Sequence, residues 1–169
     1  MAGPMEIKAI QAPLKTKYRD DPASARITLI ARAGGKDTPL ACSVDLGRAI
    51  YAAEAHSGVG GTGAAACSGD LLLGALAACA QITCQLVGAA MGVKIQSVGV
   101  TVEGILDLRG TLGVSRDVPV GFENIRLGFD VKAPEATREQ LDALKRKTEE
   151  YCVVFQTLLK PPALTVKWS

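Results

Sequence analysis

The residues of this chain best suited to chemistry are its five cysteines, which are Cys42, Cys67, Cys79, Cys84 and Cys152. No two of them have the CxxC spacing, so a thioredoxin-type motif or a zinc ribbon has no support. The 169 residues contain one histidine, His56. A metal site built on several histidines and most Ser-His-Asp sites are therefore hard to assemble, so no metal site of that kind is expected. Chemistry is expected from thiols that meet in the fold, while the ordinary alternative is that each cysteine is a small buried hydrophobe.

Composition narrows the class of protein. Hydrophobic residues make up 48% and charged residues 21%, which is typical of a globular chain. The formal net charge of +2 is too small for a basic nucleic-acid footprint, so no nucleic-acid partner is expected. No apolar run follows a basic start within residues 1–11, so we predict no signal peptide and a cytoplasmic protein, where free thiols are the rule.

The longest apolar stretch runs from Leu71 to Val93 and contains Cys79 and Cys84. Its length of 23 residues fits a membrane span, which needs about 20. Hydrophobicity all round the axis equally describes a helix buried in a soluble domain, which we favour because glutamines and a threonine interrupt the second half. We predict a helix with Ser68 as N-cap, Asp70 in its first turn and Gly92 at its end.

The two cysteines of this stretch lie on different faces of the predicted helix. At about 100° per residue, Cys79 and Cys84 stand about 140° apart, so Cys79 must find a partner elsewhere. Cys152 is the candidate, since it lies at the junction of two predicted helices. If the second helix begins there, its N-terminal amides favour a thiolate. The alternative is that Cys152 merely packs.

The remaining elements are mostly short strands and one amphipathic helix. Thr137 and Gln140 form a capping-box pattern before a helix with Leu141, Leu144, Thr148 and Tyr151 on one stripe. The glycine-rich stretch Ser57–Gly69 is a connector or a wall of a site, and no Gly-Lys-Ser/Thr supports a phosphate loop. A turn is expected at Gly34–Asp37, and strands are predicted at Met5–Gln11, Arg26–Ala33, Leu40–Leu46, Val93–Leu108, Asn124–Lys132 and Ala163–Trp168.

The predicted order is β-β-β, helix, β-β, helix-helix, β. Strands cluster rather than alternate with helices, which favours an α+β fold over a doubly wound sheet. No linker divides the chain, so we expect a single domain over residues 1–169, with residues 1–25 as an N-terminal extension or strand.

Two segments together resemble the OsmC/Ohr family of osmotically inducible and organic hydroperoxide resistance proteins. The segment SGDLLLGALAACAQITCQLVGAAMGV, Ser68–Val93, is similar to the family's central helix, and EEYCVVFQTL, Glu149–Leu158, is similar to its second cysteine element. The resemblance covers roughly residues 26 to 168. It implies antiparallel sheets around a long buried central helix, in an entwined homodimer with two active sites at the subunit interface.

The resemblance also implies a thiol-dependent peroxidase that prefers organic hydroperoxides. Cys79 then corresponds to the peroxidatic thiol and Cys152 to the resolving one, and an external dithiol, of the dihydrolipoamide type, reduces their disulfide without a cofactor. The chain departs from the pattern at Gly69, where a glutamate is usual, and at Val153, where a proline is usual. A non-catalytic member that binds a small apolar or electrophilic ligand, and a redox sensor, are the alternatives.

The family supplies an arginine that stabilises the thiolate, held by a carboxylate. Three basic residues here are candidates: Arg48, which we favour, Lys36 and Arg32. Asp70 is the candidate carboxylate, with a charge at the start of the helix as its alternative role. Cys42, Cys67 and Cys84 have no counterpart in the family and are expected to be core or loop thiols, and His56 is expected to be a loop histidine.

Overall fold

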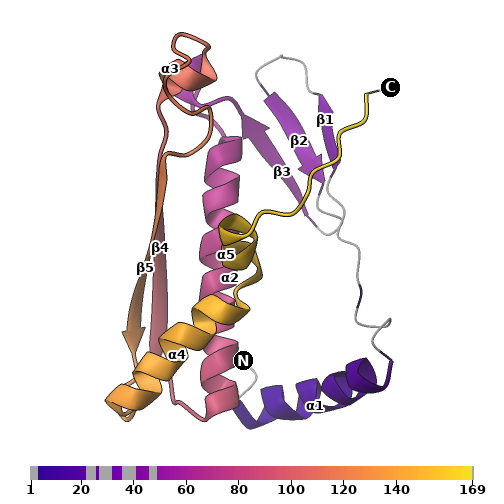
Figure 1. Cartoon of the computed structure of the whole chain (residues 1–169), viewed down its shortest axis with the longest axis vertical. Helices are drawn as coiled ribbons and strands as arrows, with labels where there is room; N and C mark the ends of the chain where they lie inside the picture. Colours follow the sequence, from indigo (N-terminus) through magenta and orange to yellow (C-terminus); the bar gives the residue numbers. More distant parts are fainter. Residues whose placement is uncertain (1–3, 22–25, 27–31, 36–40, 46–48, 169) are drawn as a thin grey trace. The chain divides into compact units, whose positions relative to one another are not determined.

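The computed structural model describes residues 4–21, 26, 32–35, 41–45 and 49–168. Figure 1 shows the elements in chain order: α1 Pro4–Asp20, β1 Arg32–Gly35, β2 Ala41–Asp45, β3 Ile50–Glu54, the short 3-10 helix η2 Ser57–Val59, α2 Ser68–Met91, β4 Ser97–Ile105, α3 Leu108–Thr111, β5 Asn124–Lys132, α4 Arg138–Tyr151 and α5 Val153–Leu159. Helices and antiparallel strands are grouped in sequence, so the α+β prediction is confirmed.

The chain divides into two compact units. The first consists of Met1–Thr16, Ala75–Thr101 and Leu127–Ser169, and the second of Lys17–Gly74 and Val102–Arg126. The long helix α2 and the β4–β5 pair each contribute to both. The expectation of one domain over residues 1–169 stays a prediction.

The core of the first unit lies where α2 and α4 meet. Its buried members are Cys84, Val87, Val93, Ala133 and Leu144. The buried stripe of α2 is narrow, and its members are Leu76, Ala80, Cys84, Val87, Gly88 and Ala89. The other apolar side chains of α2 remain partly or fully open in the single chain. The prediction of a helix buried on all sides is therefore met on only one face of α2 in the single chain.

The helix α4 follows its predicted capping box. Thr137 Oγ1 accepts a hydrogen bond from the Gln140 N–H at 3.2 Å, and Gln140 Oε1 accepts one from the Thr137 N–H at 2.9 Å. Leu144 and Thr148 are buried as expected. Tyr151 is not, because the helix ends at this residue and its ring remains exposed.

The second unit contains a three-stranded antiparallel sheet in the order β1-β2-β3. The strand β3 was not predicted, because its sequence IYAAE lacks the alternation of apolar and polar residues that marks a half-buried strand. Its last residue, Glu54, anchors the glycine-rich connector. The Glu54 carboxylate accepts hydrogen bonds from the Thr62 hydroxyl at 3.0 Å and from the Ala65 N–H at 3.1 Å. The Glu54 N–H also donates to the Ala66 carbonyl at 3.1 Å, so both the backbone and the side chain of Glu54 hold the connector in place.

The strands β4 and β5 pair antiparallel. At their ends Gln96 donates to the Lys132 carbonyl and Glu123 donates to the Ile105 carbonyl. Strand β5 has the predicted bounds, whereas β4 is shorter than predicted, because Gly92 with a φ of 74° turns the chain after α2 and Asp107 caps α3. Gly104 in β4 lies under the Phe122 ring, where a Cβ atom would come within 2.4 Å of a ring carbon.

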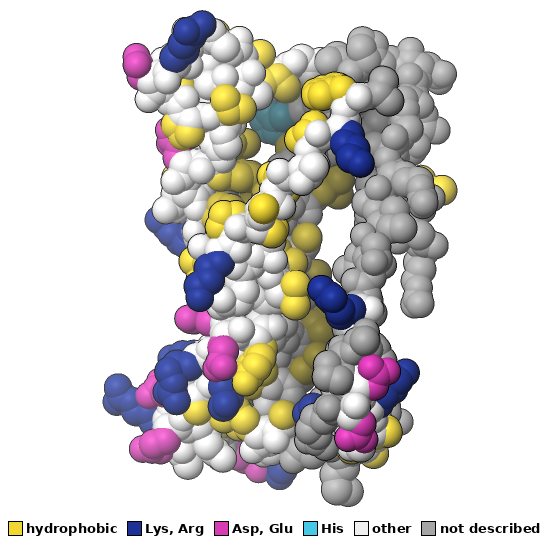
Figure 2. Space-filling view, turned by 45° about the vertical axis from the view of Figure 1, so that its right-hand side comes forward, with side chains coloured by type: hydrophobic (Ala, Val, Ile, Leu, Met, Phe, Trp, Pro, Cys, Tyr) yellow, Lys and Arg dark blue, Asp and Glu magenta, His cyan; other side chains and the backbone are white. Residues whose placement is uncertain are grey.

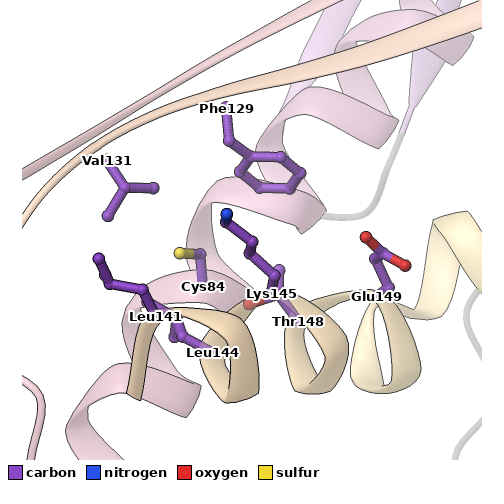
Figure 3. A pocket seen from close by; sticks show the side chains of 8 residues that line it. All are labelled: Cys84, Phe129, Val131, Leu141, Leu144, Lys145, Thr148 and Glu149. Carbon is purple, nitrogen blue, oxygen red and sulfur yellow. The ribbon is translucent and has the colours of Figure 1, made fainter. Parts of the chain in front are cut away.

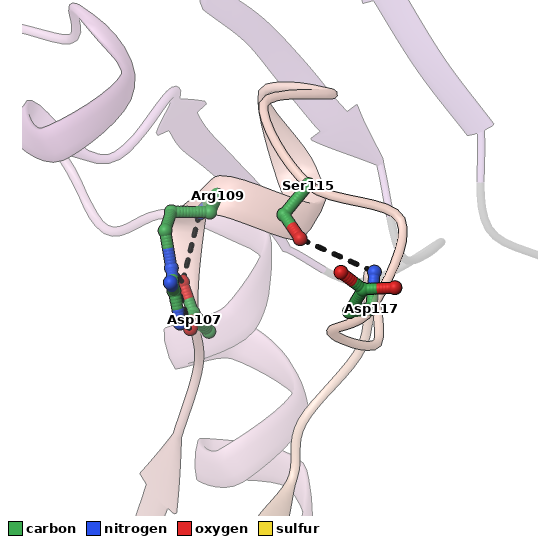
Figure 4. A network of polar contacts seen from close by, with 4 residues as sticks. All are labelled: Asp107, Arg109, Ser115 and Asp117. Carbon is green, nitrogen blue, oxygen red and sulfur yellow. Dashed lines mark hydrogen bonds and ion pairs between the residues drawn. The ribbon is translucent and has the colours of Figure 1, made fainter.

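Beyond β4, polar contacts fix the loop around α3. Figure 4 shows Asp107 accepting hydrogen bonds from the backbone N–H and the guanidinium of Arg109, and Ser115 accepting one from the Asp117 N–H. The chain between β4 and β5 is therefore an ordered connection that includes the short helix α3.

Two predicted strands are wrong. The stretch Met5–Gln11 lies inside α1, because its Met, Glu, Lys, Ala and Gln residues favour a helix and Pro4 is tolerated in a first helical turn, although α1 also contains Pro13. Ala163–Trp168 forms no strand, because no neighbouring strand among the described residues pairs with it and its side chains are exposed. The predicted turn at Gly34–Asp37 begins inside β1. Residues 27–31, 36–40 and 46–48, which carry parts of other predictions, lie outside the described residues.

Candidate active site

The first thiol of the candidate site is Cys79, in the middle of α2. Its side chain is half-buried, and its Sγ lies 4.0 Å from Oγ1 of Thr83, one helical turn further along. Residues four apart on a helix share a face, so this contact follows directly from the spacing. Cys84 lies on the other side of α2, as predicted, in the buried core.

The second thiol is Cys152, which separates α4 from α5. Its N–H donates to the Thr148 carbonyl at 3.0 Å, and its own carbonyl accepts from the Gln156 N–H at 2.9 Å. Its φ and ψ of −75° and 107° are extended rather than helical, so the chain bends at this residue. The predicted junction of two helices is confirmed, and its side chain is only 1% exposed.

The structure brings Cys79 and Cys152 together, although they are far apart in the sequence. Burial raises the pKa of the Cys79 thiol, but the backbone N–H of Val154, the Cys152 thiol, the Thr83 hydroxyl and the backbone N–H of Val153 together outweigh it. The net pKa of Cys79 lies below its ordinary value. The first amides of α5 thus stabilise a thiolate on Cys79, on the neighbouring helix, rather than on Cys152.

The two thiols are driven in opposite directions. Burial raises the pKa of Cys152, and the nearby Cys79 sulfur raises it further, against a smaller opposing effect of the Phe155 and Val154 amides. Both cysteines are free thiols in the structure. The arrangement therefore consists of one thiol that ionises more readily than an ordinary cysteine beside one that ionises less readily.

The position of the candidate cation is not described. Arg48 and Lys36 lie outside the described residues, and Arg32 begins β1 with a side chain that is also outside them. Among the described groups, no Lys or Arg contributes to the pKa of Cys79. The assignment of Arg48 stays a prediction.

Asp70 forms a capping box with Cys67 at the start of α2. The Asp70 carboxylate accepts from the Cys67 N–H at 2.9 Å, and Cys67 Sγ accepts from the Asp70 N–H at 3.5 Å. These two contacts hold the pKa of Asp70 below its ordinary value, and His56 adds a smaller electrostatic effect. The N-cap is therefore Cys67 rather than the predicted Ser68, because the Cys67 sulfur accepts the Asp70 N–H as a serine hydroxyl would. A catalytic part for Asp70 stays a prediction.

The other candidates lie apart from the thiol pair. His56 caps η2 by accepting the Gly58 N–H at 3.0 Å, which agrees with a loop histidine. Cys84 is a core thiol, whereas the side chain of Cys42 lies outside the described residues. Within the part of the chain that the structure describes, no three His, Cys, Asp or Glu residues are grouped as metal ligands.

Sequence reasoning missed two features of the site. Thr83 is one, and its spacing of four residues from Cys79 was the signal that could have found it. The other is that the amides of Val153 and Val154 face Cys79, which depends on tertiary packing and has no signal in the sequence.

A model of the OsmC-like protein family matches residues 61–167, which is most of the chain. This chain belongs to the OsmC-like protein family. The match includes both Cys79 and Cys152. A comparison with curated protein sequences gives no significant match.

Solved structures of OsmC-like proteins share the fold. An OsmC-like protein from Mycoplasma pneumoniae is 17% identical, with 80% of this chain and 89% of that chain covered and a TM-score of 0.68. An organic hydroperoxide resistance protein from Elizabethkingia anophelis is 20% identical, with 80% and 91% covered and a TM-score of 0.63. An OsmC-like protein from Vibrio cholerae is 15% identical, with 78% and 94% covered and a TM-score of 0.65. At these identities the likeness establishes the fold.

Family membership also decides how α2 is interpreted. An 18-residue window of this helix has a mean hydropathy of 1.7, so its length and composition alone would allow a membrane span. Core helices of soluble proteins have the same character, and OsmC-like proteins are soluble. The helix α2 is accordingly the central helix of an OsmC-like fold.

Proposed function

We propose that this OsmC-like protein is a thiol-dependent peroxidase that reduces organic hydroperoxides to alcohols and so protects the cell under oxidative stress. The observation that carries the proposal is the meeting of two free thiols with opposite pKa shifts, Cys79 lowered and Cys152 raised. A peroxidatic thiol must be ionised to attack, and a resolving thiol must lie close by.

The first step is the attack of the Cys79 thiolate on the terminal oxygen of a hydroperoxide ROOH. A sulfur–oxygen bond forms and the O–O bond breaks, which leaves a sulfenic acid on Cys79 and an alkoxide that takes a proton from solvent to become ROH. The amides of Val153 and Val154 and the Thr83 hydroxyl stabilise the attacking thiolate. The sulfur is oxidised by two electrons and the peroxide is reduced by two.

The second step joins the two sulfurs. The Cys152 sulfur attacks the Cys79 sulfenic acid, a disulfide forms, and the departing hydroxide and the proton of the Cys152 thiol leave as water. The raised pKa of Cys152 keeps that proton on the thiol until the sulfenic acid is present. This order avoids two adjacent thiolates in the resting protein.

An external dithiol then restores the resting state by exchange. Cys152 is almost fully buried, whereas Cys79 is half-buried, so the reductant's sulfur reaches Cys79 and Cys152 departs. The second thiol of the reductant breaks the mixed disulfide and releases Cys79. Dihydrolipoamide has the required pair of thiols.

We further propose a cytoplasmic homodimer. Apolar side chains on α2, around the thiol pair and on α5 remain exposed in the single chain, among them Ile82 at 55%, Val153 at 71% and Leu159 at 59%. Figure 2 also shows hydrophobic side chains reaching the surface between charged ones. A second copy would cover such surface and would explain the open faces of α2. Analytical ultracentrifugation of the wild type and of Ile82→Glu tests this, with Arg126→Glu as the surface control.

The test of the activity is consumption of cumene hydroperoxide with dihydrolipoamide as reductant. Cys79→Ser is expected to abolish turnover, and Cys152→Ser to leave a sulfenic acid on Cys79 that dimedone labels. Cys84→Ala, a change to a thiol of the same helix outside the pair, is the matched control and should retain turnover. An unmodified Cys79 after prolonged exposure of the wild type to peroxide would reject the proposal and leave a ligand-binding member of the family. A disulfide that forms but does not turn over would indicate a redox sensor.

A further inference from the structure

A pocket lies in the first unit, against Cys84 rather than Cys79. Figure 3 shows it between the strand β5, which contributes Phe129 and Val131, and the helix α4, which contributes Leu141, Leu144, Lys145, Thr148 and Glu149, with Cys84 of α2 alongside. The cavity has a volume of about 250 Å³. An apolar protein cavity of about 150 Å³ holds a benzene molecule, so this pocket accommodates a ring with a short substituent.

The pocket contains one buried polar group without a partner. Thr148 is 2% exposed, and its hydroxyl oxygen has no hydrogen-bond partner among the described residues. It faces the Cys84 thiol, whose pKa is raised by burial and lowered slightly by this hydroxyl, but the two do not meet in hydrogen-bond geometry. A buried hydroxyl that lacks a partner is costly by about 1–3 kcal/mol, so an explanation is required for its presence here.

The two charged residues that line the pocket, Lys145 and Glu149, have opposite charges. Lys145 is exposed and also lies 3.7 Å from the Asp142 carboxylate. No positive charge is left over to balance an anionic ligand. Burial of an unpaired charge in an apolar site is strongly unfavourable, so the charge balance selects a neutral ligand.

We propose that this pocket binds a small neutral organic molecule with one hydrogen-bonding group, such as a phenol or another alcohol, whose polar atom bonds to the Thr148 hydroxyl. The hydroxyl oxygen is closed to solvent in the empty pocket. Binding therefore requires the oxygen to rotate toward the ligand, which is feasible because a threonine in a helix divides between two χ1 rotamers. The apolar walls from Phe129, Leu141 and Leu144 contact the rest of the molecule.

The pocket does not use the thiol pair. Cys84 and Cys79 are on different faces of α2, and no lining residue of this pocket contributes to the pKa of Cys79. Cys84 itself is unsuited to covalent chemistry because burial keeps it protonated. The site is therefore a binding site and not a second redox site.

The experiment compares p-cresol with p-xylene, its isostere without the hydroxyl, by NMR titration of the full chain. The wild type should bind p-cresol about two- to tenfold more tightly than p-xylene, the size of one buried hydrogen bond. Thr148→Val, which keeps the side-chain shape, should bind the two equally. Shifts should concentrate on the methyl groups of Leu141, Leu144 and Val131. Benzoate, which is charged, should not bind.

Two further variants localise the effect. Val131→Phe fills the pocket from the strand and should abolish binding of both probes, with folding checked by the NMR spectrum. Cys79→Ser should leave binding unchanged. The proposal is overturned if the folded wild type binds neither probe up to the solubility limit, if Thr148→Val keeps the preference for p-cresol, or if Cys79→Ser abolishes binding.

Discussion

Two thiols five residues apart on α2 have opposite properties. Cys79 has a lowered pKa because amides of α5, a second thiol and a hydroxyl surround its half-buried sulfur. Cys84 has a raised pKa because it lies in the core between α2 and α4, with one hydroxyl nearby. The same residue type on the same helix is therefore prepared for redox chemistry on one face and for packing on the other.

The difference shows that burial alone does not decide the state of a cysteine. Burial raises the pKa of both thiols, and what separates them is the supply of donors to the thiolate. Around Cys79 these donors come from the break between α4 and α5 at Cys152. The bend in the chain at Cys152 thus has a chemical consequence for a residue on another helix.

The largest expected contrast is in stability. Leu144, which packs against Cys84 in the core, is 2% exposed, so Leu144→Ala should lower the free energy of unfolding by about 2–5 kcal/mol. Cys79→Ala removes a half-buried side chain and should lower it by about 1 kcal/mol or less. Urea unfolding at one protein concentration measures both. Equal losses would show that the two faces of α2 are packed alike.

The next contrast is in reactivity. In the native protein iodoacetamide should modify Cys79 about 100-fold faster than Cys84, since Cys84 is both protonated and buried. The rate at Cys79 should fall as the pH drops through its lowered pKa, where the thiolate is lost. Mass spectrometry of the labelled peptides gives both rates. Comparable rates near neutral pH would contradict the assignment of Cys79 as the more readily ionised thiol.

Much of the fold was readable from local patterns. The capping box of Thr137 and Gln140, the alternation in Asn124–Lys132 and the apolar run of α2 each specify their element within one or two residues, because each signal is local. The failures are also physical. The strand predicted at Met5–Gln11 is helical, because this short window contains several helix formers and the helix continues through Pro13 to Asp20. Ala163–Trp168 has strand alternation but no neighbouring strand to pair with among the described residues.

The site was readable only in part. The junction at Cys152 was predicted because an amphipathic helical pattern ends there and an apolar one begins. The pairing of Cys79 with Cys152 was implied by the family resemblance. The donors could not be predicted, because the direction in which the Val153 and Val154 amides point depends on how α5 packs against α2. The pocket at Thr148 could not be predicted either, since Thr148 follows the apolar stripe of α4 and nothing in the sequence shows that its hydroxyl lacks a partner.

A smaller effect on stability is expected from a change at the start of α4, the helix that packs against Cys84 and ends beside Cys152. Thr137→Ala removes the N-cap of α4, which carries Leu144 and Thr148 and ends beside Cys152, and should cost about 0.5–2 kcal/mol of stability. Thr157→Ala, a change at an exposed position in α5, is the control and should cost less than about 0.5 kcal/mol. Thermal unfolding compares the two. If both variants unfold like the wild type, the capping box does not stabilise α4.

The smallest expected effect is the contribution of one hydrogen-bond donor, the Thr83 hydroxyl, to the reactivity of Cys79. Thr83→Val keeps the shape of the side chain and removes a hydroxyl 4.0 Å from the Cys79 sulfur. Because this hydroxyl lowers the pKa of Cys79, its loss should raise that pKa and reduce the alkylation rate near neutral pH by about two- to threefold, as expected for one weak hydrogen bond. Thr83→Ser should restore the rate, and Cys84 should be unaffected. A loss far above tenfold would mean that Thr83, rather than the amides of α5, is the main donor to the thiolate, and the contrast between the two faces of α2 would then depend on a single side chain of α2 itself.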